Sequence, residues 1–155
     1  MVGRFVSQDP IGLFGGFNLF LFGNNTFTWF DQLGLAGTTT DSKGNTIITS
    51  DYGVPDKSTF EPKQGIGKYK RLGPCGPTAQ QTAAVQGQPC VVCGGIEAKM
   101  VADHIDPLVV EHYRTGTNDV VKQTQVSSVQ SHCPTCSKIQ GGQASAFSKC
   151  MAGKI

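Results

Sequence analysis

Four of the six cysteines form two Cys-x-x-Cys pairs, a spacing that suits a shared metal ion. The pairs are Cys90 with Cys93 and Cys133 with Cys136, and residues 94–132 separate them. Two intervening residues let both thiolates of a pair reach one ion, and four thiolates bind Zn²⁺ tetrahedrally at about 2.3 Å. The sequence therefore predicts a structural zinc site. Two redox dithiols are the alternative, although such pairs usually occur singly and near a βαβ pattern.

Asp103 and His104, between the two pairs, could perform phosphodiester chemistry. A carboxylate such as Asp103 can bind a hard divalent cation such as Mg²⁺. A neutral His104 can deprotonate a water for attack on phosphorus, while the ion stabilises the developing charge. Adjacent side chains on a strand point to opposite faces, so this chemistry requires a strand end or bulge where both reach one cleft.

Two further side chains, His112 and Arg114, are candidates for contacting phosphate, because guanidinium offers a fork of donors. The alternative is a solvent-exposed hairpin without a ligand. Lysines could also follow a nucleic-acid backbone, although lysines on helices are usually only solvated. They are Lys122, Lys138 and Lys149.

Short elements must position these residues. Pro77 and Gly87 bracket a predicted helix, residues 98–105 favour a strand, and residues 46–49 favour one half of a hairpin. Residues 107–113 indicate a second strand or extended turn. Residues 123–149 indicate helix in places, broken near Pro134 and at Gly141-Gly142. Residues 36–74 have the glycine, proline and polar content of a linker.

The composition indicates one small, loop-rich domain with a modest core. Of the 155 residues, 15% are charged, 38% are hydrophobic, 20 are glycine and 8 are proline, which excludes a coiled coil or a long helical bundle. Residues 1–60 hold three Lys or Arg and five Asp or Glu, whereas residues 61–155 hold ten and six. The basic second part permits a polyanionic partner. No apolar run is long enough for a membrane span, and no signal-peptide pattern begins the chain.

Residues 3–35 hold seven of the nine phenylalanines and the single tryptophan. The stretches Gly3-Arg4-Phe5-Val6-Ser7-Gln8-Asp9-Pro10-Ile11-Gly12-Leu13, Gly15-Gly16-Phe17-Asn18-Leu19 and Trp29-Phe30-Asp31-Gln32-Leu33-Gly34-Leu35 resemble the Rhs repeat-associated core segment. That resemblance implies a short β segment that closes an Rhs β-cage. It also implies self-cleavage after Leu35, with Asp9 and Asp31 as the nearest carboxylates, and a variable toxin downstream with a cognate immunity protein. Gln32 replaces the family's proline, and a plain turn at Asp9-Pro10 is the alternative.

Residues 88–149 resemble the HNH endonucleases in the order of the first cysteine pair, Asp103-His104-Ile105-Asp106-Pro107-Leu108 and the second pair. This resemblance implies a ββα-metal fold. In that family a histidine or asparagine directly follows the last cysteine, but Ser137 stands here, and a hydroxyl is a poor ligand. A water or one of three side chains could replace it as the third ligand: His132, Gln140 or Gln143.

The sequence therefore predicts an α+β protein with three parts: a β segment at 1–35, a linker at 36–74 and an HNH-like nuclease domain at 75–155. The expected function is that of a bacterial effector toxin, delivered into the target-cell cytoplasm, that degrades DNA with structural Zn²⁺ and catalytic Mg²⁺. A non-catalytic Cys₄ module that binds nucleic acid or protein, and the same nuclease acting on RNA, are the alternatives. Cys75 and Cys150 are either free thiols or a pair.

Overall fold

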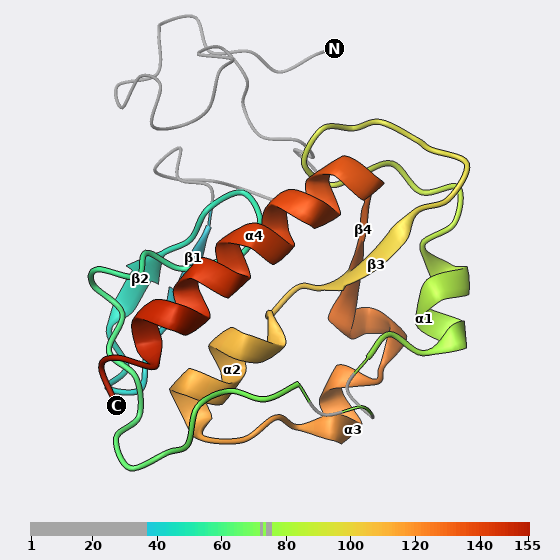
Figure 1. Ribbon diagram of the computed structural model, residues 1–155. Coiled ribbons are helices and arrows are strands. Elements are labelled where there is room, and N and C mark those ends of the chain that lie inside the picture. Colours follow the sequence, from blue (N-terminus) through green and yellow to red (C-terminus); the bar gives the residue numbers. More distant parts are fainter. Residues whose placement is uncertain (1–36, 72, 74–75) are drawn as a thin grey trace, which may run out of the picture.

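A computed structural model describes residues 37–71, 73 and 76–155 (Figure 1). The predictions for the β segment at 1–35, including Asp9, Asp31 and Leu35, lie outside the described residues. The described chain forms two separate two-stranded antiparallel sheets and several helices. The expected α+β class is confirmed.

The first sheet is the hairpin of β1 (Thr38–Thr40) and β2 (Thr46–Ile48), in which Thr39 pairs with Ile47. The carboxylate of Asp41 orders its turn by accepting hydrogen bonds from the backbone N–H groups of Lys43 and Asn45, both at 2.9 Å. An aspartate that bonds the backbone two residues on is a frequent turn former. The hairpin expected from residues 46–49 is confirmed.

The second sheet is the hairpin of β3 (Val101–His104) and β4 (Val129–His132). Val101 pairs with His132 and His104 pairs with Val129. Before β3 lies α1 (Ala79–Ala84), which Thr78 and Gln81 begin as a capping box. The strand expected within residues 98–105 is confirmed with narrower bounds.

Residues 107–113 do not form the expected second strand or extended turn. They belong to α2 (Leu108–Thr115), which Pro107 precedes and Gly116 ends at a φ of +93°. A proline before the first turn and a left-handed glycine after the last are helix boundaries, and they prevail over the β-branched run. α3 (Val120–Gln123) and the 3₁₀ turn η3 (Val126–Ser128) then lead into β4.

The long helix α4 (Pro134–Met151) begins directly after β4 and runs past α2 toward the β1–β2 hairpin (Figure 1). Its first turn is capped by the Cys133 sulfur. The break expected at Gly141-Gly142 is absent from this helix. A Cβ at either glycine would meet no atom within 4 Å, so both face open space. Packing of the opposite face, which includes the buried Gln140 and Phe147, maintains the helix across them.

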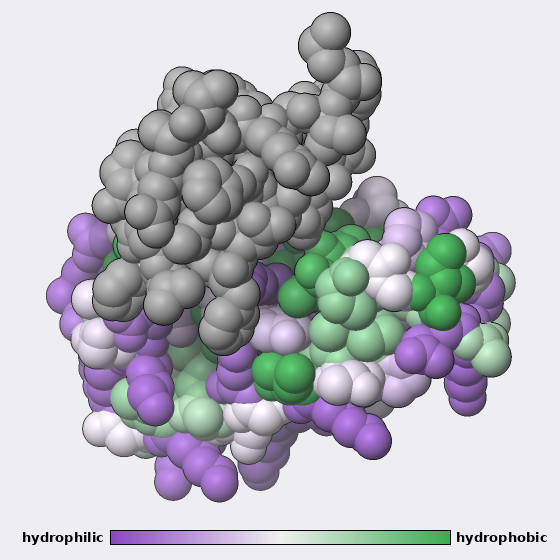
Figure 2. Space-filling model, turned by 90° about the horizontal axis from the view of Figure 1, so that it is seen from above, coloured by the Kyte–Doolittle hydropathy of each residue, from purple (hydrophilic) through white to green (hydrophobic). Residues whose placement is uncertain are grey.

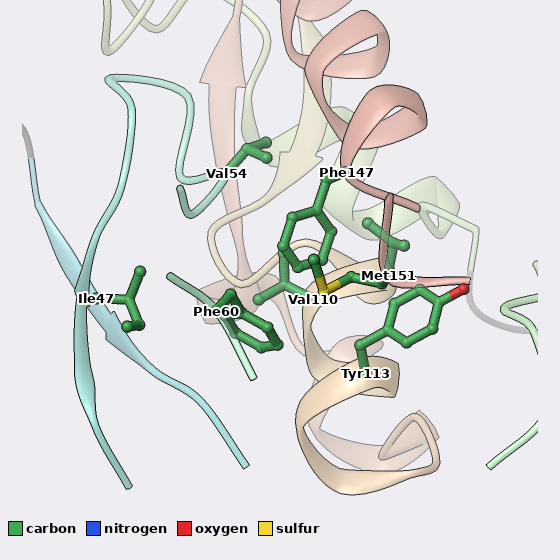
Figure 3. Packing of buried hydrophobic residues seen from close by; sticks show 8 residues of the cluster. Ile47, Val54, Phe60, Val110, Tyr113, Phe147 and Met151 are labelled. Carbon is green, nitrogen blue, oxygen red and sulfur yellow. The ribbon is translucent and has the colours of Figure 1, made fainter. Parts of the chain in front are cut away.

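The main core joins the first hairpin, α2 and α4 (Figure 3). Phe60 packs against Phe147 with ring centroids 5.1 Å apart. The ring centroids of Phe147 and Tyr113 are 6.2 Å apart. Ile47, Val54 and Phe60 all come from residues 36–74. The expectation that this stretch is a linker is therefore wrong for its described part, because its apolar residues complete the core of the C-terminal domain.

Replacing Phe147 with alanine is expected to lower the free energy of unfolding by about 3–5 kcal/mol, because the ring is 1% exposed and its removal leaves a cavity. Ile139→Ala is the matched control on the same helix. Ile139 is 41% exposed, and its loss should cost about 1 kcal/mol or less. Urea titrations followed by circular dichroism give both values. Equal costs for the two variants would contradict the proposed core.

None of the described helices has both the length and the apolar content needed to cross a membrane.

Candidate metal centre and catalytic residues

The four cysteines of the two pairs converge on one point. The sulfur atoms of Cys90, Cys93, Cys133 and Cys136 all lie within 4.8 Å of one another. The Sγ atoms of Cys93 and Cys133, from different pairs, are 3.8 Å apart. That separation excludes a disulfide, whose sulfur atoms lie about 2.05 Å apart. Sulfur atoms about 2.3 Å from a tetrahedral zinc would lie about 3.8 Å from one another. The cluster therefore fits one zinc ion.

Local backbone geometry presents each pair of sulfurs. After the first pair, Gly94 has a φ of +73° and its N–H donates to the carbonyl of Cys90 at 2.8 Å. In the second pair, the N–H of Cys136 donates to the sulfur of Cys133 at 3.4 Å. A left-handed glycine costs little where another residue would be strained. The first pair thus precedes β3 in the sequence and the second pair follows β4, but their sulfur atoms are adjacent in space.

The thiols differ in acidity before any ion binds. Burial raises the pKa of Cys90, but the backbone N–H groups of Cys93, Cys133 and Val92 outweigh it and bring that pKa to about 6. Burial and the neighbouring thiols raise the pKa of Cys136 to about 12. A cation would favour the thiolate form of every cysteine in the cluster, because a metal-bound thiol is deprotonated.

Asp103 and His104 lie on opposite faces of the β3–β4 hairpin. Asp103 Oδ2 accepts a hydrogen bond from His132 Nδ1 at 3.0 Å, on the face that also carries Val101. The His104 side chain is on the other face, with Ala102, and its Nε2 donates to the backbone carbonyl of Gln123 at 3.1 Å. The single cleft expected to hold both side chains is therefore not present in this arrangement.

His104 is held as a neutral imidazole. Its side chain is buried, and burial, which outweighs the hydrogen bond to Gln123, lowers its pKa below 6.5. A neutral imidazole that donates through Nε2 carries its lone pair on Nδ1. Gln81 Nε2 also donates to the Gln123 carbonyl, at 2.7 Å. The carbonyl thus fixes both the orientation and the tautomer of His104.

The candidates for a third metal ligand have different surroundings. His132 is fully buried, and no hydrogen-bond partner is present for its Nε2 among the described residues. Gln140 Nε2 donates to the carbonyl of Tyr52 at 2.9 Å, and Gln143 Oε1 accepts from Ser50 Oγ at 2.7 Å. Both glutamines therefore anchor residues 50–52 to α4. Only His132 lies beside Asp103.

The two predicted phosphate contacts are engaged inside the protein. Arg114 pairs with Asp106 and donates to Thr39 Oγ1 at 3.0 Å. His112 Nε2 donates to the carbonyl of Gly67 at 2.8 Å. Each side chain therefore ties a neighbouring segment to α2, and contact with a phosphate would require an exchange of partners.

Sequence reasoning missed Glu111, a buried carboxylate that organises the turn after α2. Its Oε2 accepts from Gln123 Nε2 at 2.9 Å and from Asn118 Nδ2 at 3.0 Å, and Lys122 Nζ lies 3.9 Å from Oε1. Through Gln123 this network sets the carbonyl that holds His104. No local motif indicates such a role, because the partners are 7 to 12 residues away, in the turn after α2 and on α3.

Comparison with known proteins gives one short similarity. The chain is 56% identical over 36 residues to the double-stranded DNA deaminase toxin A of Burkholderia cenocepacia (strain H111). The match covers 23% of this chain and 2% of that toxin. No protein-family model matches the chain, and no solved structure does. The chain therefore shares a segment with a bacterial toxin and spans only a small part of it.

Proposed function

We propose that this chain is the DNA-acting end of a bacterial effector toxin and that residues 75–155 hydrolyse DNA as an HNH-type endonuclease. The observation that carries the proposal is the ββα unit of β3, β4 and α4. A Cys₄ cluster joins the segment before β3 to the start of α4, and Asp103 and His104 end the first strand. The similarity to a toxin named for DNA supports the choice of substrate. An Rhs cage, self-cleavage after Leu35 and a cognate immunity protein belong to the same proposal.

In this proposal His104 is the general base. The carbonyl of Gln123 leaves Nδ1 as the proton acceptor, and the low pKa keeps it unprotonated at neutral pH. Asp103 is the ligand for a catalytic cation, proposed to be Mg²⁺. Its carboxylate is 21% exposed, and a single carboxylate is a usual protein contribution to such a site. The ion, when bound, supplies stabilisation of charge on the phosphate. Because the two side chains lie on opposite faces of the hairpin, action on one phosphate requires the end of β3 to rearrange.

Incubating supercoiled plasmid with the purified chain tests the proposal. We expect nicked and linear DNA in Mg²⁺, and intact plasmid without added divalent cation. Incubation with RNA of matched sequence tests the alternative that the nuclease acts on RNA. Intact DNA and RNA under every cation condition would refute hydrolysis and leave the non-catalytic Cys₄ module.

Deamination of DNA bases is a second candidate, which the similarity to a deaminase toxin favours. Zinc deaminases use a His-x-Glu and a Pro-Cys-x-x-Cys motif, with water as the fourth zinc ligand. Pro89-Cys90-Val91-Val92-Cys93 has the second pattern, but none of the three histidines is followed two residues later by glutamate. Four converging thiols also leave no ligand position for water.

Treating the same DNA with uracil-DNA glycosylase and alkali separates the two activities. Deamination of cytosine gives strand breaks only after that treatment. Hydrolysis gives breaks without it. We expect breaks without glycosylase.

A further inference from the structure

We propose that residues 63–71, called here the basic segment, bind the phosphodiester backbone of DNA and lead it to His104. This proposal rests on the proposed function, since it assigns the substrate surface of the same site. The segment reads Lys63-Gln64-Gly65-Ile66-Gly67-Lys68-Tyr69-Lys70-Arg71 and carries four cationic residues.

The charge of the basic segment is uncompensated in its surroundings along the chain. From residue 62 to residue 96 the sequence contains no aspartate or glutamate. Lys68, Lys70 and Arg71 are exposed, and among the described residues no ion pair involves them. Nucleic-acid affinity arises mainly from cations that neutralise phosphates and release counterions. The segment supplies a local concentration of such cations.

The basic segment is fixed on α2 rather than loose. The N–H of Lys63 donates to the carbonyl of Tyr113 at 2.7 Å, and Lys63 Nζ donates to the carbonyl of Thr115 at 2.8 Å. The N–H of Tyr69 donates to the Tyr113 hydroxyl at 3.3 Å, and His112 holds Gly67. A surface held in one geometry loses less conformational entropy when it binds.

The packing between α2 and the basic segment is close. A Cβ at Gly116, which ends α2, would lie 3.2 Å from Ile66 Cγ2, so any larger residue would have to displace the Ile66 side chain. The centroids of the Tyr69 and His112 rings are 5.5 Å apart. His112, first considered as a phosphate ligand, therefore supports the cations that we assign to phosphate.

The basic segment runs beneath α2 toward α3 in Figure 1. Figure 2 shows the molecule from above, and on that face the described residues are a mixture of apolar and hydrophilic ones. α3 ends at Gln123, whose backbone carbonyl accepts a hydrogen bond from His104 Nε2 at 3.1 Å, so the segment runs toward the element that fixes this imidazole. A backbone bound along Lys68, Lys70 and Arg71 would thus arrive beside the proposed general base.

Fluorescence anisotropy of a labelled 20-base-pair duplex tests the proposal on the full chain without added divalent cation. The variant is Lys68→Gln/Lys70→Gln. Its matched control is Lys43→Gln/Lys57→Gln, which removes two exposed lysines outside the basic segment. Removing two phosphate contacts should reduce the slope of log affinity against log salt by about 1.8 and weaken binding on the order of 50-fold at 0.1 M salt. The control should keep most of the affinity of the wild type.

The outcomes separate this proposal from the proposed function. Reduced binding by the segment variant, with no cleavage by the wild type in Mg²⁺, would support the surface and refute the nuclease. Cleavage by the wild type, with equal salt slopes for both variants, would refute the surface. The surface would also be refuted if the wild type failed to bind DNA. It would likewise be refuted if the segment variant lost affinity for an acidic protein but kept the wild-type affinity for DNA.

Discussion

Replacing Cys133 with serine is expected to abolish zinc binding and the cooperative thermal unfolding of the domain. Structural zinc binds zinc-finger peptides with about 10–16 kcal/mol of apparent free energy. A small domain is stable by only about 5–15 kcal/mol. The ion would therefore contribute as much as the whole net stability.

The position of Cys133 increases this effect. Its sulfur caps the first turn of α4 and belongs to the smaller buried cluster with Met100 and Ala102. Loss of the ion releases the start of α4 and the end of β4 together. The β3–β4 hairpin alone has too few strands to be stable in water.

Cys150→Ser is the matched control, because Cys150 is half-buried on α4 and outside the cluster. Metal analysis should give one zinc for each chain in the wild type and in this control, and none in Cys133→Ser. Circular dichroism melts with and without a chelator complete the test. A Cys133→Ser chain with an unchanged melt and one bound zinc would contradict the metal centre.

The parts of the structure that sequence predicted depend on short-range chemistry. The cysteine pairs are fixed by a two-residue spacing, and the hairpin turn is fixed by Asp41 bonding its own neighbours. Such features require only a few adjacent residues, so they can be predicted from the sequence.

The parts that were wrong depend on distant partners. Val109 and Val110 suggested a strand, but burial against Phe147 and the ends at Pro107 and Gly116 make them helical. The apolar residues of the supposed linker have no regular period, because Ile47 enters the core from a three-residue strand and Val54 and Phe60 enter it from irregular segments. Tertiary packing overrides weak local preferences in such cases.

The placement of His104 and Asp103 could be predicted from the sequence only in part. Their types and their order between the cysteine pairs were visible in the sequence. Their separation onto two faces follows from the regular alternation of β3 up to its last residue, with no bulge at Asp103 or His104. No feature of the sequence predicted that regularity.

His104→Ala is expected to lower kcat for DNA cleavage by about 10²–10⁴-fold, the usual contribution of a general base. The fold should survive the change, because Gln81 continues to bond the Gln123 carbonyl. His104→Gln is the second variant, since its amide can donate to that carbonyl but cannot accept the proton. Both variants should keep zinc and the wild-type affinity for duplex DNA.

The pH profile gives an independent readout of the same residue. The pKa of His104 is lowered from 6.5, so the base remains unprotonated below the pH at which a solvated imidazole becomes charged. Activity of the wild type should therefore decline only as pH falls below 6.5. The residual activity of His104→Gln should lack this acid limb. An acid limb that begins above pH 6.5, or that persists in His104→Gln, would assign the base to another group.

Asp103→Asn decides whether the two faces of the hairpin serve one reaction. Asparagine can still accept the hydrogen bond from His132 Nδ1, but it binds Mg²⁺ more weakly than a carboxylate does. If Asp103 is the ion ligand, this variant should need a higher Mg²⁺ concentration for half-maximal cleavage, whereas His104→Gln should leave that concentration unchanged. The hairpin end must then rearrange when DNA binds. An unchanged Mg²⁺ requirement in Asp103→Asn would instead confine the reaction to the face that carries His104, with Asp103 orienting His132 beside the zinc cluster.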